Sequence, residues 1–282
     1  MIRSVVVGLD GSAESRAAVE WAAHEAKRRF LPLRLVHVWE PVHGSVALAQ
    51  LLGAEARNPW SERLSREVVE GLGPRHPGLD VSVEQVPGRP AEVLTRVAKD
   101  AELLVLGSRG MSGIDAFLVG SVGQAVVAHA ERPVVLVRAG ERAADGPVVL
   151  GLDTDHPDDT VIAYAFEAAA RRVTPLRVIH AWNPPPYFAH GLPTDPELNA
   201  ALGKQDAVTL AELLHRWKEK YPAVEVREES RSGSPAVHLA DASREASLVV
   251  VGRRGPLGGH IGPVTQAVLH HATAPVAVVA HD

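Results

Sequence analysis

The stretch Leu103-Leu104-Val105-Leu106-Gly107-Ser108-Arg109-Gly110 has a second version in this chain, Leu248-Val249-Val250-Val251-Gly252-Arg253-Arg254-Gly255. Both versions run from four apolar residues into a loop bounded by glycines, and a segment of helical spacing that contains Gln-Ala-Val follows each. This is the pattern of a strand, a glycine-rich loop and a helix. Glycine lets the backbone approach a ligand closely, and a helix N-terminus favours an anion. The sequence therefore predicts a phosphate- or nucleotide-binding unit that occurs twice.

The repeat extends beyond the two loops. Val5–Asp10 returns as Val148–Asp153, and Pro32–Trp39 returns as Pro175–Trp182, in both cases 143 positions later. Collinear matches across a whole half indicate a duplicated domain rather than a short solenoid repeat. The polar segment between the halves, bounded by Gly140 and Gly146, has the composition of a linker.

Within each half, short apolar runs alternate with segments of helical spacing. The runs are apolar throughout, so both faces of each strand are expected to be covered, as in a parallel sheet with helices on both sides. The expected fold class is α/β, with two tandem Rossmann-like domains of five parallel strands each, at 1–140 and 147–282. In the first half, the expected strands are 4–9, 33–38, 81–86, 103–106 and 134–137.

Composition narrows the possible functions. The net charge is −5, which disfavours nucleic acid as a partner, because phosphates require clustered Lys and Arg. The chain has no cysteine, so disulfides, thiolate metal sites and a cysteine nucleophile are excluded. No run reaches the ~20 apolar residues of a membrane span. Because Val5 lies so near Met1, no room remains for a signal peptide, and we expect a cytoplasmic protein.

The first half contains a candidate ligand site. In open parallel sheets the ligand lies beyond the carboxyl ends of the strands, and Asp10 and Gly107 follow or end two of the expected strands. Backbone N–H groups near Gly107, Gly120 and Ser121 are placed to bind phosphate, and Asp10 is placed to accept from an adenine or ribose group. The alternative is structural: glycines for a tight turn, and Ser121 as a helix N-cap.

These motifs together resemble the universal stress protein family. The resemblance rests on Gly107-x-x-Gly110-x9-Gly120-Ser121, on Val6–Ser12, on Gly88-Arg89-Pro90-Ala91 and on Arg132–Val137. It covers both halves and is closest to the tandem-domain actinobacterial type. It implies a fold like that of the adenine nucleotide alpha hydrolases, and a regulatory protein that binds ATP with Mg²⁺ in stress or growth-arrest responses.

The resemblance also implies roles for individual residues. Asp10 and Val38 would contact the adenosine, and the phosphates would be bound by Gly107, Arg109, Gly110, Gly120 and Ser121. It implies no catalytic residue and no metal-ligating residue. It further implies an unidentified protein partner and pairing of the final strands, either within one chain or in a homodimer.

The second half departs from the pattern, so we expect weaker nucleotide binding there. From Gly252 to Gln266 is 14 positions, against 17 from Gly107 to Gln124, and Pro263 replaces Ser121. Proline offers neither an N–H nor a hydroxyl. The candidate residues of this weaker site are Asp153, Gly252, Gly255 and Gly262. Four nearby carboxylates would repel a triphosphate or, alternatively, serve as helix N-caps: Asp153, Asp155, Asp158 and Asp159.

Three other functions stay open at this point. One is a slow ATPase or nucleotidyl-transfer enzyme at the first site, and another is a nucleotide-free dimerising scaffold. The third is a cyclic nucleotide as the ligand, since an adenosine pocket does not fix the phosphate chain. The histidines show no metal-binding spacing, and His37 and His180 are expected to be structural.

Overall fold

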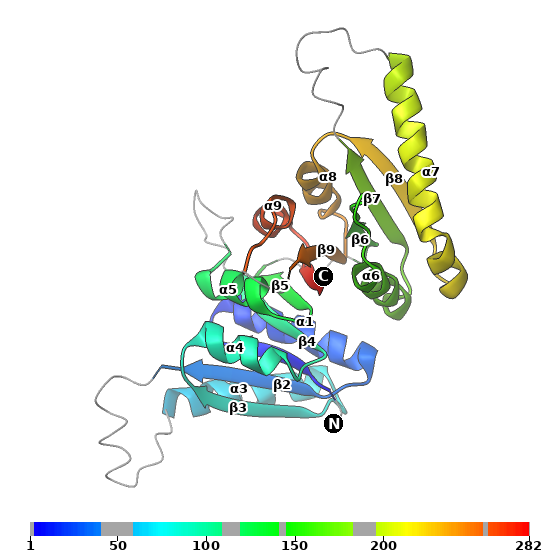
Figure 1. Ribbon diagram of the computed structural model, residues 1–282. Helices are drawn as coiled ribbons and strands as arrows, with labels where there is room; N and C mark the ends of the chain where they lie inside the picture. The colour runs from blue at the N-terminus through cyan, green and yellow to red at the C-terminus, as the bar shows by residue number, and fades with distance from the viewer. Residues whose placement is uncertain are drawn as a thin grey trace. The chain divides into compact units, whose positions relative to one another are not determined.

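The computed structural model describes residues 3–40, 59–108, 119–140, 145–182, 196–255 and 259–281 (Figure 1). The chain divides into two compact units, Met1–Gly140 and Glu141–Asp282. Arg109 and Gly110 of the predicted site lie outside the described residues.

Unit 1 is built on a parallel sheet whose strands lie in the order β3-β2-β1-β4-β5. Four helices accompany the sheet in the described part of this unit. The helices α1 and α3 contact each other, as do α4 and α5. The elements are β1 (Val5–Leu9), α1 (Ala13–Arg29), β2 (Leu33–Trp39), α3 (Pro59–Arg75), β3 (Val81–Pro87), α4 (Pro90–Ala98), β4 (Leu103–Ser108), α5 (Ser121–His129) and β5 (Val134–Arg138).

Unit 2 repeats this arrangement. Its parallel strands lie in the order β8-β7-β6-β9-β10. The helix α8 packs against α9, and α7 packs along the edge strand β8. The elements are β6 (Val148–Gly151), α6 (Asp159–Arg172), β7 (Leu176–Trp182), α7 (Pro196–Lys220), β8 (Val226–Ser232), α8 (Pro235–Ala242), β9 (Leu248–Arg254), α9 (Pro263–His271) and β10 (Val276–His281).

The α/β fold class with two tandem parallel-sheet domains is confirmed, and the sequence explains why. The central strands β1 and β4 are apolar and almost wholly buried, as expected of strands covered on both faces. The edge strand β3, by contrast, contains Ser82, Glu84 and Gln85, and none of its residues is buried. The five strands expected in the first half are all present, with ends that differ by no more than two residues.

The first helix of each unit ends in the same unusual way. Phe30 after α1 has φ 55° and Val173 after α6 has φ 51°, both in the left-handed region. Their N–H groups donate to the last carbonyls of the helix, which is the role that glycine usually plays there. Both side chains are almost fully exposed, at 94% and 93%.

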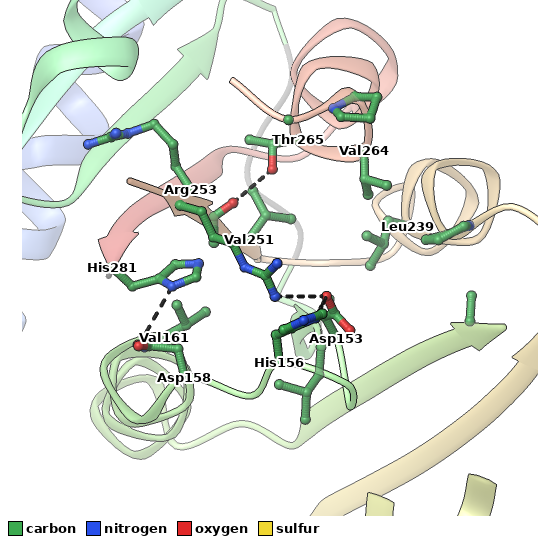
Figure 2. Close-up of a pocket in the computed structure, with 18 of the residues that line it drawn as sticks. Asp153, His156, Asp158, Val161, Leu239, Val251, Arg253, Val264, Thr265 and His281 are labelled. Atoms are coloured by element: carbon green, nitrogen blue, oxygen red, sulfur yellow. Dashed lines mark hydrogen bonds and ion pairs between the residues drawn. The ribbon is translucent and has the colours of Figure 1, made fainter. Parts of the chain in front are cut away.

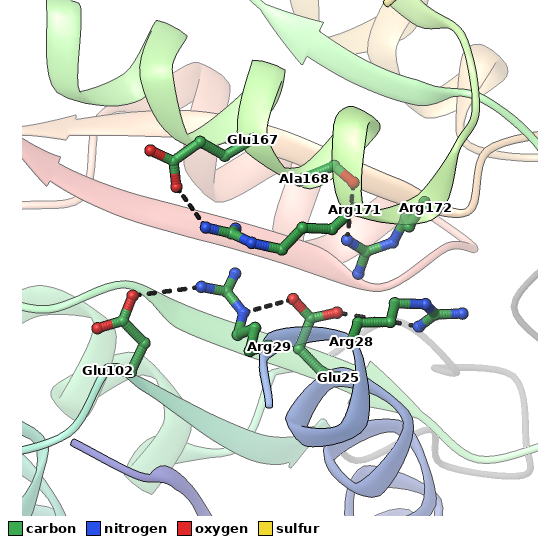
Figure 3. A network of polar contacts seen from close by, with 8 residues as sticks. All are labelled: Glu25, Arg28, Arg29, Glu102, Glu167, Ala168, Arg171 and Arg172. Carbon is green, nitrogen blue, oxygen red and sulfur yellow. Dashed lines mark hydrogen bonds and ion pairs between the residues drawn. The ribbon is translucent and has the colours of Figure 1, made fainter. Parts of the chain in front are cut away.

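The last turn of α1 contains a buried ion pair (Figure 3). Arg29 Nε donates to Glu25 Oε1 over 2.7 Å, and Arg29 Nη1 donates to Glu102 Oε1 over 3.3 Å, which joins the helix to the start of β4. In unit 2 the residue 143 positions after Glu25 is Ala168. There Arg172, the counterpart of Arg29, donates to the carbonyl of Ala168 over 3.2 Å.

Among the described residues, no helix combines the length and the apolar character needed to cross a membrane.

Candidate functional site

Three of the predicted residues of unit 1 lie at the carboxyl ends of its strands. Asp10 follows β1 directly. Val38 is the penultimate residue of β2, and Gly107 is the penultimate residue of β4. The strands β2, β1 and β4 are neighbours and parallel, so their carboxyl ends meet at one edge. This is the edge at which open α/β sheets bind ligands. His37 Nδ1 lies 2.7 Å from the carbonyl oxygen of Leu9, so this histidine links the ends of β2 and β1, a structural role.

Asp10 is exposed and organises the start of α1. Its Oδ1 accepts from the backbone N–H of Ser12 over 3.0 Å and from the Ser12 hydroxyl over 2.6 Å. The Ser12 hydroxyl in turn accepts from the N–H of Ser15, which makes Ser12 the N-cap of α1. A local turn thus holds the Asp10 carboxylate just after the carboxyl end of β1.

Gly120 and Ser121 form the beginning of α5. Gly120 is the N-cap and Ser121 is the first helical residue, with an exposed side chain. The alternative in which Ser121 is the N-cap is therefore wrong, because the cap is one residue earlier and uses no side chain. The hydroxyl of Ser121 and the first N–H groups of α5 remain suitable donors for an anion.

Gly107 has a packing reason to be glycine. A Cβ at this position would lie 2.6 Å from the backbone carbon of Glu14 and 2.7 Å from the backbone nitrogen of Ser15. The first turn of α1 therefore sits directly on Gly107. The close packing requires a glycine at this position whether or not a ligand binds. The presence of Gly107 is therefore explained by packing alone.

Unit 2 contains a pocket of about 560 Å³ at the corresponding edge (Figure 2). A volume of roughly 300–1,000 Å³ is typical of small-molecule sites. Three of the four predicted residues line it, namely Asp153, Gly252 and Gly262. Ala181, the counterpart of Val38, also lines it, whereas Gly255 is not part of the lining. Gly255 instead adopts φ +93°, a conformation that favours glycine.

One wall of this pocket is apolar. It combines the ends of the strands with residues of α8 and α9, and Figure 2 shows Leu239 and Val264 on that side. Such a wall suits the face of a purine or another flat apolar group. Its members are Leu152, Ile179, Pro235, Leu239, Val251 and Val264.

The other wall is polar and carries paired charges. Arg254 Nη2 lies 3.2 Å from Asp153 Oδ2, and His156 Nδ1 lies 3.4 Å from the same oxygen. Across the pocket, His281 Nδ1 lies 3.6 Å from Asp158 Oδ2 (Figure 2). These contacts place a basic or protonatable group beside each carboxylate of the lining.

Arg253 is a buried cation of the same wall. It takes the place of Ser108 in unit 1, and its Nη1 donates to the carbonyl of Gly255 over 2.8 Å. Burial lowers the pKa of Arg253, yet a guanidinium stays protonated at neutral pH. Arg253 therefore lines the pocket, but Figure 2 shows its side chain extending away from Asp153 and Leu239.

The four carboxylates of the second half have separate roles. Asp158 is the N-cap of α6 and accepts from the N–H groups of Thr160 and Val161 over 2.8 and 3.2 Å. Asp159 forms an ion pair with Arg216 of α7. Asp153 and Asp158 are the two of the four that line the pocket. The capping interpretation therefore describes Asp158 correctly, and four free charges do not face the site.

Several residues of this pocket were not predicted from the sequence. Arg253, His281 and Thr265 line it together with Asp153, although they come from the last two strands and the helix between them. The paired arginines Arg253-Arg254 at a strand end were a visible signal. Nothing near His281 in the sequence indicated that its ring would reach Asp158, 123 positions earlier.

A family model described as the universal stress protein family matches residues 1–138 and again 146–280. The chain belongs to the universal stress protein family. The two matches fall one on each unit, so the family domain is present twice.

Universal stress proteins with two domains are among its relatives. One from Mycolicibacterium smegmatis is 35% identical over 98% of this chain and 96% of its own length. One from Mycobacterium tuberculosis is 35% identical over 97% of this chain and 96% of its own length. A solved universal stress protein of Archaeoglobus fulgidus shares the fold over 99% of this chain and 98% of its own, with a TM-score of 0.71 at 18% identity.

Proposed function

We propose that this universal stress protein is a nucleotide-dependent regulator whose ligand is ATP, accompanied by Mg²⁺. Nucleotide occupancy would set its conformation or its choice of protein partner in a stress or growth-arrest response. The observation that carries the proposal is the pocket of unit 2, at the carboxyl ends of β6 and β9, with one apolar wall and one polar wall that includes two arginines. A nucleotide has the same division, an aromatic base at one end and phosphates at the other.

The two units would differ in affinity. In unit 1 the proposed contacts are Asp10 and Val38 for adenosine, and Gly107, Arg109, Gly110, Gly120 and Ser121 for the phosphates. Ser121 offers an N–H and a hydroxyl at the first position of α5, while Pro263 at the first position of α9 offers neither. In unit 2 the proposed contacts are Asp153, Gly252, Gly255 and Gly262, with Arg253 as an added phosphate contact.

Magnesium fits this site as part of the nucleotide. Asp153 and Asp158 already face Arg254, His156 and His281, so neither carboxylate of the lining lacks a basic neighbour. Mg²⁺ commonly binds through one or two carboxylates, waters and the phosphates of its substrate. We therefore expect Mg²⁺ to enter bound to the phosphates of ATP.

Native mass spectrometry and calorimetric titration with Mg·ATP test the proposal. We expect one tight and one weak site per chain. Ser121→Pro copies the unit 2 residue into a position where proline is compatible with a helix, so the fold is retained and the tight site weakens. Arg253→Ser copies the unit 1 residue into unit 2 and is expected to weaken the second site about tenfold, the loss of one charge-assisted hydrogen bond.

Pro263→Ser is the matched reverse variant, and it should strengthen the weak site. Two equal sites would contradict the difference between the units. Tight binding of cyclic AMP without tight binding of ATP would show that the ligand is a cyclic nucleotide. A melting temperature unaffected by any nucleotide would favour the scaffold, and release of phosphate at a rate abolished by Ser121→Pro would favour an enzyme.

A further inference from the structure

A cluster of two imidazoles and a carboxylate lies between α1 and α3 of unit 1. Glu20 and His24 are one turn apart on α1, and His76 is the residue that follows α3. Their potential ligand atoms all lie within 4.8 Å of one another. It is the one group of at least three His, Cys, Asp or Glu with this geometry among the residues that the structure describes.

The distances in the cluster are those of ligands around a small cation. His76 Nε2 lies 2.8 Å and His24 Nε2 lies 3.5 Å from the same oxygen, Glu20 Oε1. Zinc binds nitrogen and oxygen ligands at about 2.0–2.1 Å in a tetrahedron, which places neighbouring ligand atoms about 3.3 Å apart. The two observed separations fall on either side of that value.

The three side chains of the cluster differ in burial, from the core to the surface. The side chain of His76 is 2% exposed, that of Glu20 is 32% exposed and that of His24 is 56% exposed. One ligand is therefore fixed in the core, and the outermost one leaves a path for an ion to enter. The rings of His24 and His76 meet edge to face, with centroids 4.7 Å apart.

The surroundings are compatible with a metal-binding state. A neutral imidazole has a lone pair to offer a metal, and His24 Nε2 faces the same Glu20 oxygen as His76 Nε2 does. Arg75 Nη1 lies 2.7 Å from Glu20 Oε2, the oxygen that faces away from the histidines. This ion pair leaves Oε1 available and orients the carboxylate, as outer partners of metal ligands commonly do.

We propose that Glu20, His24 and His76 bind a divalent transition metal of the Zn²⁺ type. Two neutral imidazoles and one carboxylate form a common zinc ligand set, and a water completes the tetrahedron. The metal would replace the hydrogen bond between His76 and Glu20, with the ring proton of His76 on Nδ1. The positive charge of Arg75 weakens the site, so we expect moderate affinity.

A metal at this position would hold α3 against α1. Without it, the described polar links are the contacts of Glu20 with Arg75 and His76, the ring contact of His24 with His76, and the exposed ion pair of Arg16 with Glu67. His76 precedes β3, at the opposite end of the strands from Asp10 and Gly107. The proposal is therefore independent of nucleotide binding and of the function proposed above.

The test is a titration of the tag-free, full-length protein with Co²⁺ and Zn²⁺ after treatment with a chelator. Co²⁺ in a tetrahedral site absorbs visible light intensely, and Zn²⁺ should displace it. We expect one such site per chain and a rise in the melting temperature with Zn²⁺. His24→Ala, at an exposed position that should not disturb folding, is expected to weaken binding at least tenfold and to abolish the thermal shift.

His215→Ala is the matched control. His215 and Glu219 on α7 form the same kind of i,i+4 pair, at 3.5 Å, and no third ligand accompanies them in the described residues. This variant should bind metal as the wild type does. Equal binding by the wild type and His24→Ala would overturn the proposal, as would the absence of a tetrahedral cobalt spectrum.

Discussion

The first helices of the two units begin at different distances along the chain from the strands that precede them. In unit 1, α1 begins at Ala13, capped by Ser12, and its first turn packs on Gly107. In unit 2, α6 begins at Asp159, three residues later relative to the 143-position repeat, and is capped by Asp158. There the side chain of His281 approaches Gly252 instead, 2.7 Å from the position of an added Cβ.

Proline accounts for the later start. Pro157 stands where unit 1 has Glu14, and the residue before a proline disfavours helical geometry. Unit 2 therefore lacks the helical turn whose backbone packs on the loop glycine in unit 1. Its pocket is lined instead by the side chains of His156, Asp158 and His281. The difference teaches that two copies of one fold can keep the same strands and yet present different surfaces to a ligand.

The largest difference between the units that mutation can test is the buried ion pair of α1. Glu25→Ala gives unit 1 the residue that unit 2 has at Ala168. Removing one partner of a buried pair costs up to about 3–5 kcal/mol. We expect the lower end of that range, because Arg29 keeps its contact with Glu102. Urea unfolding should show this loss. Glu92→Ala, which removes a carboxylate from a fully accessible ion pair with Arg89, should change stability very little.

The second test compares the two loop glycines. Gly107→Ala forces a methyl group against the backbone of Glu14, and overpacking of this kind costs about 1–3 kcal/mol. Gly252→Ala meets the ring of His281, which can turn away, although Val161 Cγ2 lies 3.3 Å from the new atom. The free energy of unfolding should fall more for Gly107→Ala. Equal losses would show that the first turn of α1 is as adaptable as a side chain.

The third test compares the helix caps. Ser12→Ala and Asp158→Ala each remove a side-chain acceptor, and a loss of about 1 kcal/mol is typical. Asp158→Ala should cost more than Ser12→Ala, because a carboxylate also interacts with the helix dipole. Thermal unfolding of the two variants measures the difference. The idea fails if Ser12→Ala proves the more damaging substitution.

The smallest expected effect concerns an arginine–glutamate pair that occurs in both edge regions. Arg34 pairs with Glu84 in unit 1, and Arg177 with Glu229 in unit 2. The carboxylate of Glu229 is 23% exposed and that of Glu84 is 44% exposed, so the second pair is better shielded from water. Burial alone raises the pKa of Glu229, but Arg177 and Arg231 outweigh it and hold that pKa below its ordinary value.

A lowered folded-state pKa adds stability above the unfolded-state pKa and loses it as the pH falls through the folded-state value. Glu229→Gln should therefore cost up to about 1 kcal/mol at neutral pH, and less in acid. Glu84→Gln is the matched control and should cost less at neutral pH. Urea unfolding at neutral and acidic pH separates the two. A loss for Glu229→Gln that does not change with pH would contradict the electrostatic explanation.

The central strands could be predicted because each is a short apolar run that is buried on both faces. Val5–Leu9 and Leu103–Ser108 carry this signal within their own residues, so the sheet and the convergence of Asp10 and Gly107 at one edge followed. The proposed roles of these residues in nucleotide binding stay predictions, as do the roles of Arg109 and Gly110, outside the described residues.

The polar wall of the pocket could not be predicted, because it depends on contacts between distant segments. Asp153 meets Arg254 across 101 positions, and Asp158 meets His281 across 123. The cluster of Glu20, His24 and His76 was hidden for the same reason. Spacing along α1 shows a glutamate and a histidine one turn apart, whereas the second histidine arrives from another helix.

The left-handed residues after α1 and α6 lower the stability of the protein below what glycine at these positions would give. An L-residue in that conformation is strained by roughly 1–2 kcal/mol, and a β-branched residue such as Val173 is especially ill suited to it. Phe30→Gly and Val173→Gly would remove the strain without emptying the core, since both side chains project into solvent. The doubly substituted chain would be more stable and would therefore tolerate further destabilising substitutions. In it, variants that damage a binding site or a buried pair would remain folded long enough for their effect on ligands to be measured.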